Sequence, residues 1–330
     1  MPQTPVTFFK SFRYPAILFL YLCVFCFFLP PASAQIINNQ PGQKLTNPLL
    51  KHIKFKELRP FKQKIEELLQ EEMAAGRCQE AAVYFRSLTN GIWIGINEKK
   101  KFAPASILKI PTMMAYFKEA ETNPELLTLN IPFSFSVKPG VQHIQAAPIK
   151  NLKKEYSIGE LIRIMIEKSD NDTLLFLQRY APMSAAVTKT FSQLGLPEIN
   201  YKPGDTIGLK TCCSLFRILY NASYLNIEMS EKALHYLSQS EYKKGLVSGV
   251  PPNITVAHKF GERTFKETGN KELHDIGIIY YPKNPYILGV MTKGDNFDNL
   301  TTVIADISRL VYNEVDSQYQ NQMADFELAE

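Results

Sequence analysis

Apolar residues follow two different periods along the chain, and each period predicts its own kind of element. A helical spacing begins at Pro60 and stops at Gly76, which predicts a first helix. Residues 81–85 and 92–96 are instead continuous apolar runs of the kind found in strands. Asn90 and Gly91 stand between the two runs, and this pair favours the tight turn of a β-hairpin.

The middle of the chain is predicted to be helical, and its last part returns to strands. Apolar residues recur about every 3.6 positions in 110–120, 158–166, 173–180, 185–194 and 211–225. Three strands and a closing amphipathic helix are then expected at 255–259, 275–280, 286–291 and 301–315. Strands at both ends of a helical block most simply form one antiparallel sheet. The predicted fold class is therefore two-lobed α+β, with a sheet flanked by helices (51–104 and 250–330) and an all-helical lobe (105–249).

The first 34 residues have the pattern of a secretory signal peptide. Lys10 and Arg13 precede an apolar run over 16–29, no acidic residue is present, and Ala32-Ser33-Ala34 follows. We expect cleavage after Ala34 and export to the periplasm or the medium, with no membrane span left afterwards. The alternative is an uncleaved anchor, but the run is shorter than the ~20 residues of a spanning helix. Residues 35–50 are polar and predict a tether before a single domain over 51–330.

Charge and cysteine content narrow the possible partners. Without Lys10 and Arg13 the chain has 35 basic and 32 acidic residues, a net charge of +3. This is too small to indicate nucleic acid or an anionic membrane as a partner. Cys78, Cys212 and Cys213 would form either one bridge from Cys78 or three buried free thiols. The spacing of His and Cys fits no zinc site, so we expect neither a metal nor another cofactor.

Three short patterns in a fixed order carry the candidate chemistry. They are Ser106-Ile107-Leu108-Lys109, Ser169-Asp170-Asn171 and Lys259-Phe260-Gly261. The first and third patterns are weak alone, and Ser240 to Lys243 is a second match to the first, whereas Ser-Asp-Asn is a fixed tripeptide and a stronger signal. The ordered set is far more specific than any member.

Ser106 is the better nucleophile candidate because of where it lies. It precedes a predicted helix starting at Ile107, and a helix N-terminus favours developing negative charge. Lys109 is one turn further on and can take the hydroxyl proton if its amine is neutral. The plainer alternative is a helix-capping serine beside a solvated lysine. Pro111 removes a helical N–H and is expected to distort the helix just beyond the site.

With these patterns the chain resembles the class A serine β-lactamases and the penicillin-binding DD-peptidases. The resemblance spans nearly all of the mature chain. It extends to the first hairpin (84–91) and to the segment that leads to the nucleophile (102–106). It also includes the helix before the second pattern (156–161) and the strand after the third (274–277). It implies a β-lactamase/transpeptidase-like fold and a β-lactam, a cell-wall peptide or a related small molecule as substrate.

The resemblance also implies a role for each motif residue. Ser106 would become acylated, with Lys109 as base or proton relay and Ser169 passing the proton to the leaving nitrogen. Asn171 would bind a substrate amide and orient Lys109. Lys259 would provide positive potential, and Gly261 and Glu262 would bind substrate beside it. The N–H groups of Ser106 and Glu262 would form the oxyanion hole.

Two departures from the family pattern affect the expected activity. Phe260 stands where the family usually has a hydroxyl that binds the substrate carboxylate, so an apolar contact is expected instead. The Ω-loop is short, with 35 positions from Asp170 to Asp205. Leu196 would replace the deacylating Glu, and Glu198 is a weak substitute on spacing alone. Slow hydrolysis of a β-lactam ester is the consequence.

Three functions remain open from the sequence. The first is an exported serine hydrolase that forms an acyl-enzyme with an amide, lactam or ester. The second is a non-catalytic binding protein for wall fragments, and the third is a structural envelope protein with coincidental motifs. His258 is left out of the catalytic set, because neighbours on a strand face opposite sides and Lys259 is expected to face the cleft.

Overall fold

The computed structural model of the chain describes residues 58–135, 144, 152–196 and 204–327. The predicted signal peptide, the tether and Glu198 lie outside these residues. None of the helices described here combines the length and the apolar character needed to cross a membrane.

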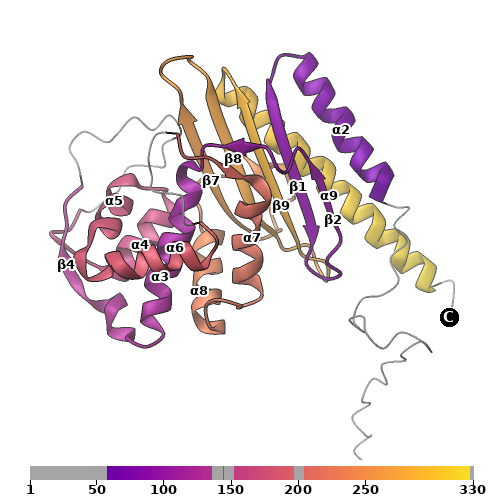
Figure 1. Cartoon of the computed structure of the whole chain (residues 1–330). Coiled ribbons are helices and arrows are strands. Elements are labelled where there is room, and N and C mark those ends of the chain that lie inside the picture. Colours follow the sequence, from indigo (N-terminus) through magenta and orange to yellow (C-terminus); the bar gives the residue numbers. More distant parts are fainter. Residues whose placement is uncertain (1–57, 136–143, 145–151, 197–203, 328–330) are drawn as a thin grey trace, which may run out of the picture. The chain divides into compact units, whose positions relative to one another are not determined.

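The sheet has five antiparallel strands in the order β2-β1-β9-β8-β7 (Figure 1). Their bounds are Glu80–Ser87 (β1), Trp93–Ile96 (β2), Val256–Thr264 (β7), Lys271–Ile279 (β8) and Tyr286–Gly294 (β9). The first strand pairs with the last, since Glu80 to Ser87 run opposite Lys293 to Tyr286. The two ends of the folded region therefore form one sheet, as the pattern predicted, and β7 is one of its edge strands.

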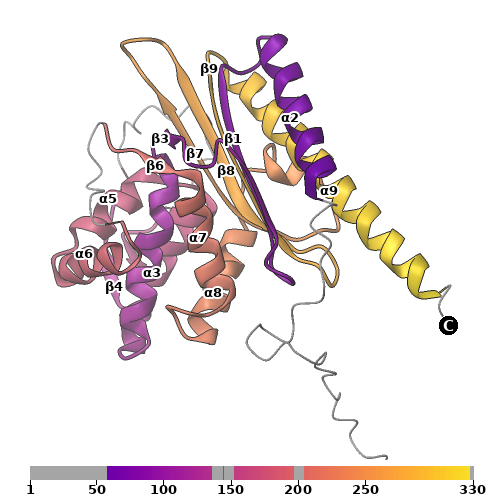
Figure 2. The same cartoon turned by 45° about the vertical axis from the view of Figure 1, so that its right-hand side comes forward.

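Two helices cover one face of this sheet, α2 (Leu58–Ala74) and α9 (Phe297–Glu327) (Figures 1 and 2). Alternate residues of β1 account for the division, because Ala81, Val83 and Phe85 pack with α2 and α9. Ala82 and Tyr84 belong to the other apolar cluster, which includes the remaining helices. The sheet is thus buried on both faces, with the two clusters separated by strand alternation.

The region between β2 and β7 is mainly helical. Its α-helices are Lys109–Ala120 (α3), Ile158–Glu167 (α4), Asn171–Arg179 (α5), Ser184–Gln193 (α6), Leu209–Tyr220 (α7) and Ile227–Ser238 (α8). Its 3-10 turns are Ala105–Leu108 (η2), Pro124–Thr128 (η3), Ala181–Met183 (η4) and Leu246–Gly249 (η5). Two short strand pairs complete it, β3 (Lys101–Phe102) with β6 (Ile207–Gly208) and β4 (Asn130–Pro132) with β5 (Glu155–Ser157).

The α+β prediction is confirmed, with several differences in the elements. Helix α8 was not predicted, although Asn226 caps it through Met229 N and Met229, Ala233 and Leu237 form its buried face. Helix α7 ends at Tyr220 rather than continuing to 225, and α9 starts at Phe297 and is longer than expected. The three cysteines are buried free thiols, so the alternative of a bridge from Cys78 is wrong.

Candidate active site

Ser106 lies in the 3-10 turn η2, directly before α3. The preceding residue, Ala105, has φ of 45°, a left-handed conformation that costs energy for a residue with a Cβ. Helix α3 begins at Lys109 rather than at Ile107, so Pro111 falls in its first turn. The N–H groups of a first turn have no partner within the helix, and proline there is tolerated. The expected distortion at Pro111 is therefore wrong, because α3 continues unbroken to Ala120.

The Lys109 ammonium nitrogen is fully buried and lies among four oxygens. Nζ is 2.8 Å from Ser106 Oγ and 2.7 Å from Asn171 Oδ1. It is also 2.6 Å from the carbonyl oxygen of Ser169 and 3.1 Å from Ser169 Oγ. The structure therefore brings the first and second motifs into direct contact.

The donors and acceptors around Lys109 Nζ show how a neutral amine can be accommodated at this position. The Asn171 amide oxygen and the Ser169 carbonyl oxygen can only accept, so they take two N–H groups of Nζ. A neutral amine then has one lone pair left, and a serine hydroxyl can donate to it. With Ser106 Oγ 2.8 Å away, this geometry suits proton transfer from Ser106 to Lys109.

Burial lowers the pKa of Lys109 from its ordinary value of 10.5 to about 7. The carboxylates of Asp170 and Glu262 act in the opposite direction and raise it. A substantial fraction of Lys109 is therefore neutral near pH 7, which is the form a general base requires.

The second motif is held in place by its own backbone conformation. Ser169 has φ of 54°, and Asp170 caps α5 by accepting a hydrogen bond of 2.7 Å from Thr173 N. This cap starts α5 at Asn171 and directs the Ser169 carbonyl and the Asn171 side chain at Lys109. The turn residues thus have both a structural and a potential chemical role.

Lys259 joins this cluster from the edge strand β7. Its Nζ lies 2.8 Å from Ser169 Oγ and 2.9 Å from the carbonyl oxygen of Phe260, and the side chain is fully buried. Burial and the nearby Lys109 lower its pKa well below the usual range. Ser169 Oγ therefore lies between two lysine nitrogens, an arrangement through which a proton can pass.

Gly261 allows β7 to approach the nucleophile closely. A Cβ at this position would lie 3.1 Å from Ser106 N and 3.1 Å from Ala105 Cβ. A side chain there would crowd the space beside the Ser106 N–H, where an oxyanion would have to enter. Because β7 is an edge strand, every second backbone N–H points away from β8, and the Glu262 N–H stays a predicted second donor.

The Glu262 side chain makes a backbone contact that the sequence did not indicate. Its two carboxylate oxygens accept from Ile144 N at 3.0 and 3.1 Å. The carboxylate also raises the pKa of both Lys109 and Lys259, so its negative charge acts on both lysines.

Alternation along β7 places His258 and Phe260 on the opposite face of the strand from Lys259, although the Phe260 ring centroid is still 4.4 Å from Lys259 Nζ. Phe260 is buried against Tyr242, with ring centroids 4.3 Å apart, so its apolar contact is made within the protein, and the contact expected with a substrate stays a prediction. His258 Nδ1 lies 2.7 Å from Asp275 Oδ1, and the other Asp275 oxygen accepts from Leu246 N at 2.9 Å. The sequence argument that kept His258 apart from the candidate catalytic set agrees with this placement.

Two side chains of β8 hold the segment that leads to Ser106, and sequence reasoning missed both. Ala103 N donates to Glu272 Oε2 at 2.8 Å, and His274 Nε2 lies 3.1 Å from Ala103 O. Both side chains are buried, and the His274 ring also makes an edge contact with Phe102. We call Glu272 and His274 the Ala103 clamp. The clamp joins residues about 170 positions apart, so no local pattern could indicate it.

A base for deacylation is not evident among the described residues near Ser106. Leu196, which aligns by resemblance with the family Glu, is buried and apolar. Asp170 caps α5 and Glu262 binds Ile144 N, so both carboxylates have other partners. In the part of the chain that the structure describes, no three His, Cys, Asp or Glu side chains are grouped as a metal site would need.

Solved structures with this fold include PBP-A and several β-lactamases. PBP-A is 20% identical, with a TM-score of 0.64 over 79% of this chain and 97% of that one. A β-lactamase from Chitinophaga pinensis is 20% identical, with a TM-score of 0.65 over 78% and 99%. A class A β-lactamase representative from Bacteroides cellulosilyticus is 19% identical, with a TM-score of 0.64 over 78% and 99%. At these identities the likeness shows the fold alone.

None of the curated proteins compared with the chain matches it. The model of the beta-lactamase enzyme family matches residues 60–315, which include all three motifs and almost every described element. The chain therefore belongs to the beta-lactamase enzyme family.

Proposed function

We propose that the chain is an exported serine hydrolase that forms an acyl-enzyme at Ser106 with an amide, lactam or ester substrate. The observation that carries the proposal is the contact of 2.8 Å between Lys109 Nζ and Ser106 Oγ, made by a buried amine whose pKa is lowered to about 7. A non-catalytic binding protein would have no need for this costly burial of two lysines.

The first chemical step is attack on the substrate carbonyl. Lys109 takes the proton of Ser106 as Oγ bonds to the carbonyl carbon. The oxyanion that forms would accept from the Ser106 and Glu262 N–H groups, in the space that Gly261 leaves open. Two such donors each contribute about 3 kcal/mol in well-studied hydrolases.

The second step expels the leaving group. The carbon–nitrogen bond breaks, and the proton on Lys109 passes through Ser169 Oγ to the leaving nitrogen. Ser169 Oγ suits this transfer because it lies 3.1 Å from Lys109 Nζ and 2.8 Å from Lys259 Nζ. The product is an ester of Ser106, which water then hydrolyses.

We propose that hydrolysis of this ester is slow when the substrate is a β-lactam. Leu196 is buried and apolar, so it cannot activate water as the family Glu does. A PBP-A mutant has been solved as an acyl-enzyme complex with penicillin G. By analogy, this chain would act as a peptidase or a slow acyl acceptor of the same family rather than an efficient β-lactamase.

The test is covalent labelling of the purified mature protein with a fluorescent penicillin and a fluorophosphonate. We expect the parent to be labelled and the Ser106→Ala variant to remain unlabelled. Ser240→Ala is the matched control, because Ser240 begins the other Ser-x-x-Lys pattern and its buried hydroxyl has no hydrogen-bond partner among the described residues. Absence of label with both probes would replace this proposal with the binding-protein function.

Export is a separate part of the proposal. The pattern of residues 1–34 supports it, and the intact mass of the product recovered from the periplasm or medium tests it. A mass that retains Lys10 and Arg13 would contradict cleavage after Ala34.

A further inference from the structure

The side chains of β7 form two rows, and one of these rows faces the nucleophile. Lys259 belongs to it, since Lys259 Nζ lies 2.8 Å from Ser169 Oγ. Gly261 belongs to it as well, since a Cβ at this position would lie 3.1 Å from Ser106 N. Arg263 is the next member, because side chains two positions apart on a strand share a face. The strand therefore presents a further cation on the face of the reaction centre.

The pairing of β7 with β8 supports this orientation of Arg263. Residues directly opposite each other on antiparallel strands have their side chains on the same face, and Arg263 lies opposite Glu272. Glu272 in turn accepts a hydrogen bond of 2.8 Å from Ala103 N, in the segment that leads to Ser106. The Arg263 side chain therefore emerges beside that segment.

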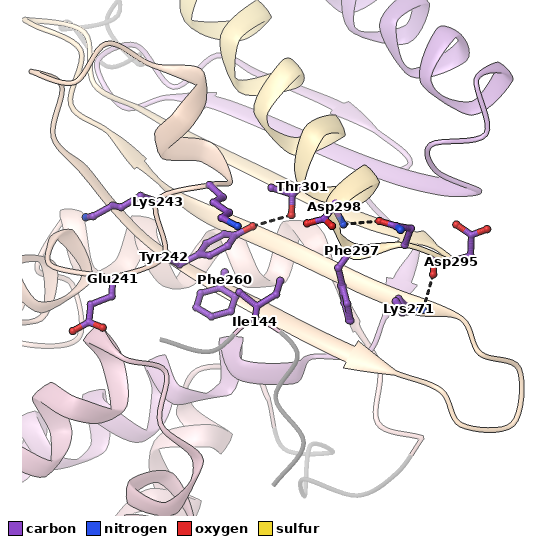
Figure 3. A pocket seen from close by; sticks show the side chains of 12 residues that line it. Ile144, Glu241, Tyr242, Lys243, Phe260, Lys271, Asp295, Phe297, Asp298 and Thr301 are labelled. Carbon is purple, nitrogen blue, oxygen red and sulfur yellow. Dashed lines mark hydrogen bonds between the residues drawn. The ribbon is translucent and has the colours of Figure 1, made fainter. Parts of the chain in front are cut away.

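The other row of β7 is unsuited to a substrate carboxylate. Phe260 lies against Tyr242 and lines a cavity on that face of the strand, as Figure 3 shows. Glu262 carries a negative charge of its own, and its carboxylate accepts hydrogen bonds from Ile144 N. An anionic group of a substrate is therefore better placed on the row of Arg263.

The Arg263 guanidinium is partly exposed and held in one direction by an aromatic ring. Its Cζ atom lies 5.2 Å from the centroid of the Phe265 ring, a cation–π contact that directs the side chain along the strand. Among the residues that the structure describes, Arg263 forms no ion pair, although Glu272 is directly opposite. Its planar set of N–H donors can therefore bind a carboxylate through two hydrogen bonds.

The order of residues along β7 indicates which part of a substrate Arg263 would meet. Ser169, the proposed proton donor to the leaving nitrogen, lies at Lys259. The reacting carbonyl would lie at Gly261, beside Ser106 N. The acyl group then extends the other way, toward Arg263. Two residues of an antiparallel strand span about 6.8 Å, so the guanidinium lies about two residues along an extended acyl chain.

We infer that Arg263 determines specificity for the acyl group, and that this group is peptide-like with a carboxylate on the second residue before the bond that is cleaved. The inference rests on the proposed acyl-enzyme function and names its substrate class. The carboxylate accepts from the guanidinium on the face shared with Gly261, while the Phe265 ring supports the guanidinium from the far end. Carboxylate recognition thereby moves from the position of Phe260 to that of Arg263.

The test uses three peptidyl fluorophosphonates whose second residue is glutamate, glutamine or lysine. Each is made with D and with L residues, and the faster configuration is compared. The readout is the second-order rate constant for labelling of Ser106, which requires no deacylation. We expect the glutamate probe to react about fivefold faster than the glutamine probe, as one exposed ion pair allows, and the lysine probe to be the slowest.

Variants of Arg263 separate its charge from its shape. Arg263→Gln should remove the difference between the glutamate and glutamine probes, and Arg263→Glu should make the lysine probe the fastest. Arg263→Lys keeps the charge without the planar donors and should retain part of the preference. Raised ionic strength should narrow the difference between the probes in the parent.

Lys266→Gln is the matched control, because it removes an exposed cation from the turn that follows β7. This variant should keep the preference of the parent, and an equal loss in it would show that only net charge matters and would overturn the inference. Equal rates for the three probes in a parent that a simple fluorophosphonate labels would also overturn it, and would leave the proposed function standing.

A binding measurement decides the case in which the parent is not labelled. Calorimetric titration of the Ser106→Ala protein with two N-acetyl dipeptide amides, Glu-Ala and Gln-Ala, requires no acylation. Tighter binding of the glutamate peptide, lost in Ser106→Ala/Arg263→Gln, would support Arg263 as an anion subsite. Equal binding of the two peptides, or binding of neither, would overturn it.

Discussion

Two buried polar clusters lie on opposite sides of β7, although His258 and Lys259 are neighbours in the chain. On one side the His258 imidazole is hydrogen-bonded to one carboxylate oxygen of Asp275. The other carboxylate oxygen accepts a hydrogen bond from Leu246 N. On the other side Lys109 and Lys259 are two potential cations that share Ser169. Both clusters are fully buried, so solvent stabilises neither.

The difference indicates what each cluster contributes. A buried carboxylate with all of its hydrogen bonds made is compatible with a stable fold. Among the described residues no carboxylate is in hydrogen-bond contact with either buried lysine, and burial lowers the pKa of both, which favours their neutral forms. We expect the first arrangement to stabilise the strand, and the second to hold an amine of lowered pKa beside Ser106 at the expense of stability.

The largest expected effect comes from removing the reactive amine. Lys109→Met should lower the rate of acylation by fluorophosphonate at least ~10³-fold, because no base then takes the Ser106 proton. The same variant should be more stable at pH 7, by on the order of a few kcal/mol, because the native amine has a pKa of about 7 against 10.5 when unfolded. Urea unfolding measures this gain.

The sign of the stability effect can be checked by changing pH. The unfolded chain binds more protons at position 109 than the native one between pH 7 and pH 10.5, so native stability rises over that interval. The advantage of Lys109→Met over the parent should therefore shrink as the pH rises. Lys118→Met on the exposed side of α3 is the control and should change stability by less than about 1 kcal/mol.

On the other side of β7, removing a buried polar side chain is expected to lower the stability of the protein rather than raise it. Asp275→Ala should destabilise the protein by about 3 kcal/mol, because it leaves Leu246 N and His258 buried without their acceptor. Asp275→Asn keeps an acceptor and should lose less. An alanine variant with the parent's urea midpoint would show that this pair does not stabilise the strand.

The Ala103 clamp should have an intermediate effect on catalysis. Glu272→Ala leaves the Ala103 N–H buried without an acceptor and loosens the segment before Ser106, so acylation should slow ~10- to 100-fold. Glu272→Gln retains an acceptor and should restore most of the rate. The rate constant at saturating probe should fall while the probe concentration for half-saturation stays constant, since Glu272 does not touch the site itself. A change only in that concentration would speak against a positioning role.

The smallest predicted effect is the pH dependence of acylation by the parent. Only neutral Lys109 is a base, so the rate should rise about tenfold from pH 6 to pH 8 and level off above, as a pKa of about 7 requires. The measurement is the labelling rate at constant ionic strength. A midpoint near the ordinary lysine value would show that burial does not control this amine.

The sequence was sufficient for the order of elements, because strand and helix patterns are local. The hairpin at Asn90-Gly91 and the alternation that separates His258 from Lys259 followed from neighbouring residues alone. Short strands such as β3 and β6 have two residues each and leave no periodic pattern. Helix α8 has a cap at Asn226 and an apolar face at Met229, Ala233 and Leu237, so its pattern is local and this helix was predictable from the sequence.

The sequence predicted which residues form the candidate site, but not which side chains hold them in place. The motifs indicated Ser106, Lys109, Ser169, Asn171 and Lys259, and the structure places all five together. The roles of these residues stay predictions until labelling tests them. The Ala103 clamp and the Glu262 contact with Ile144 depend on how distant segments meet, which single-sequence patterns do not encode. The distortion expected at Pro111 failed because the start of α3 depends on η2.

The nine paired residues between β7 and β8, from Val256 opposite Ile279 to Thr264 opposite Lys271, also fix which side chains face Ser106. A slip of one residue in this hairpin would turn Phe260 toward the nucleophile and Lys259 toward α9. Such a misaligned protein could keep most of its apolar burial and still lack its reaction centre. The length of the hairpin therefore protects the chain from a compact but inert form, and insertions in the connecting turn at 265–270 should be tolerated more readily than a single insertion within either strand.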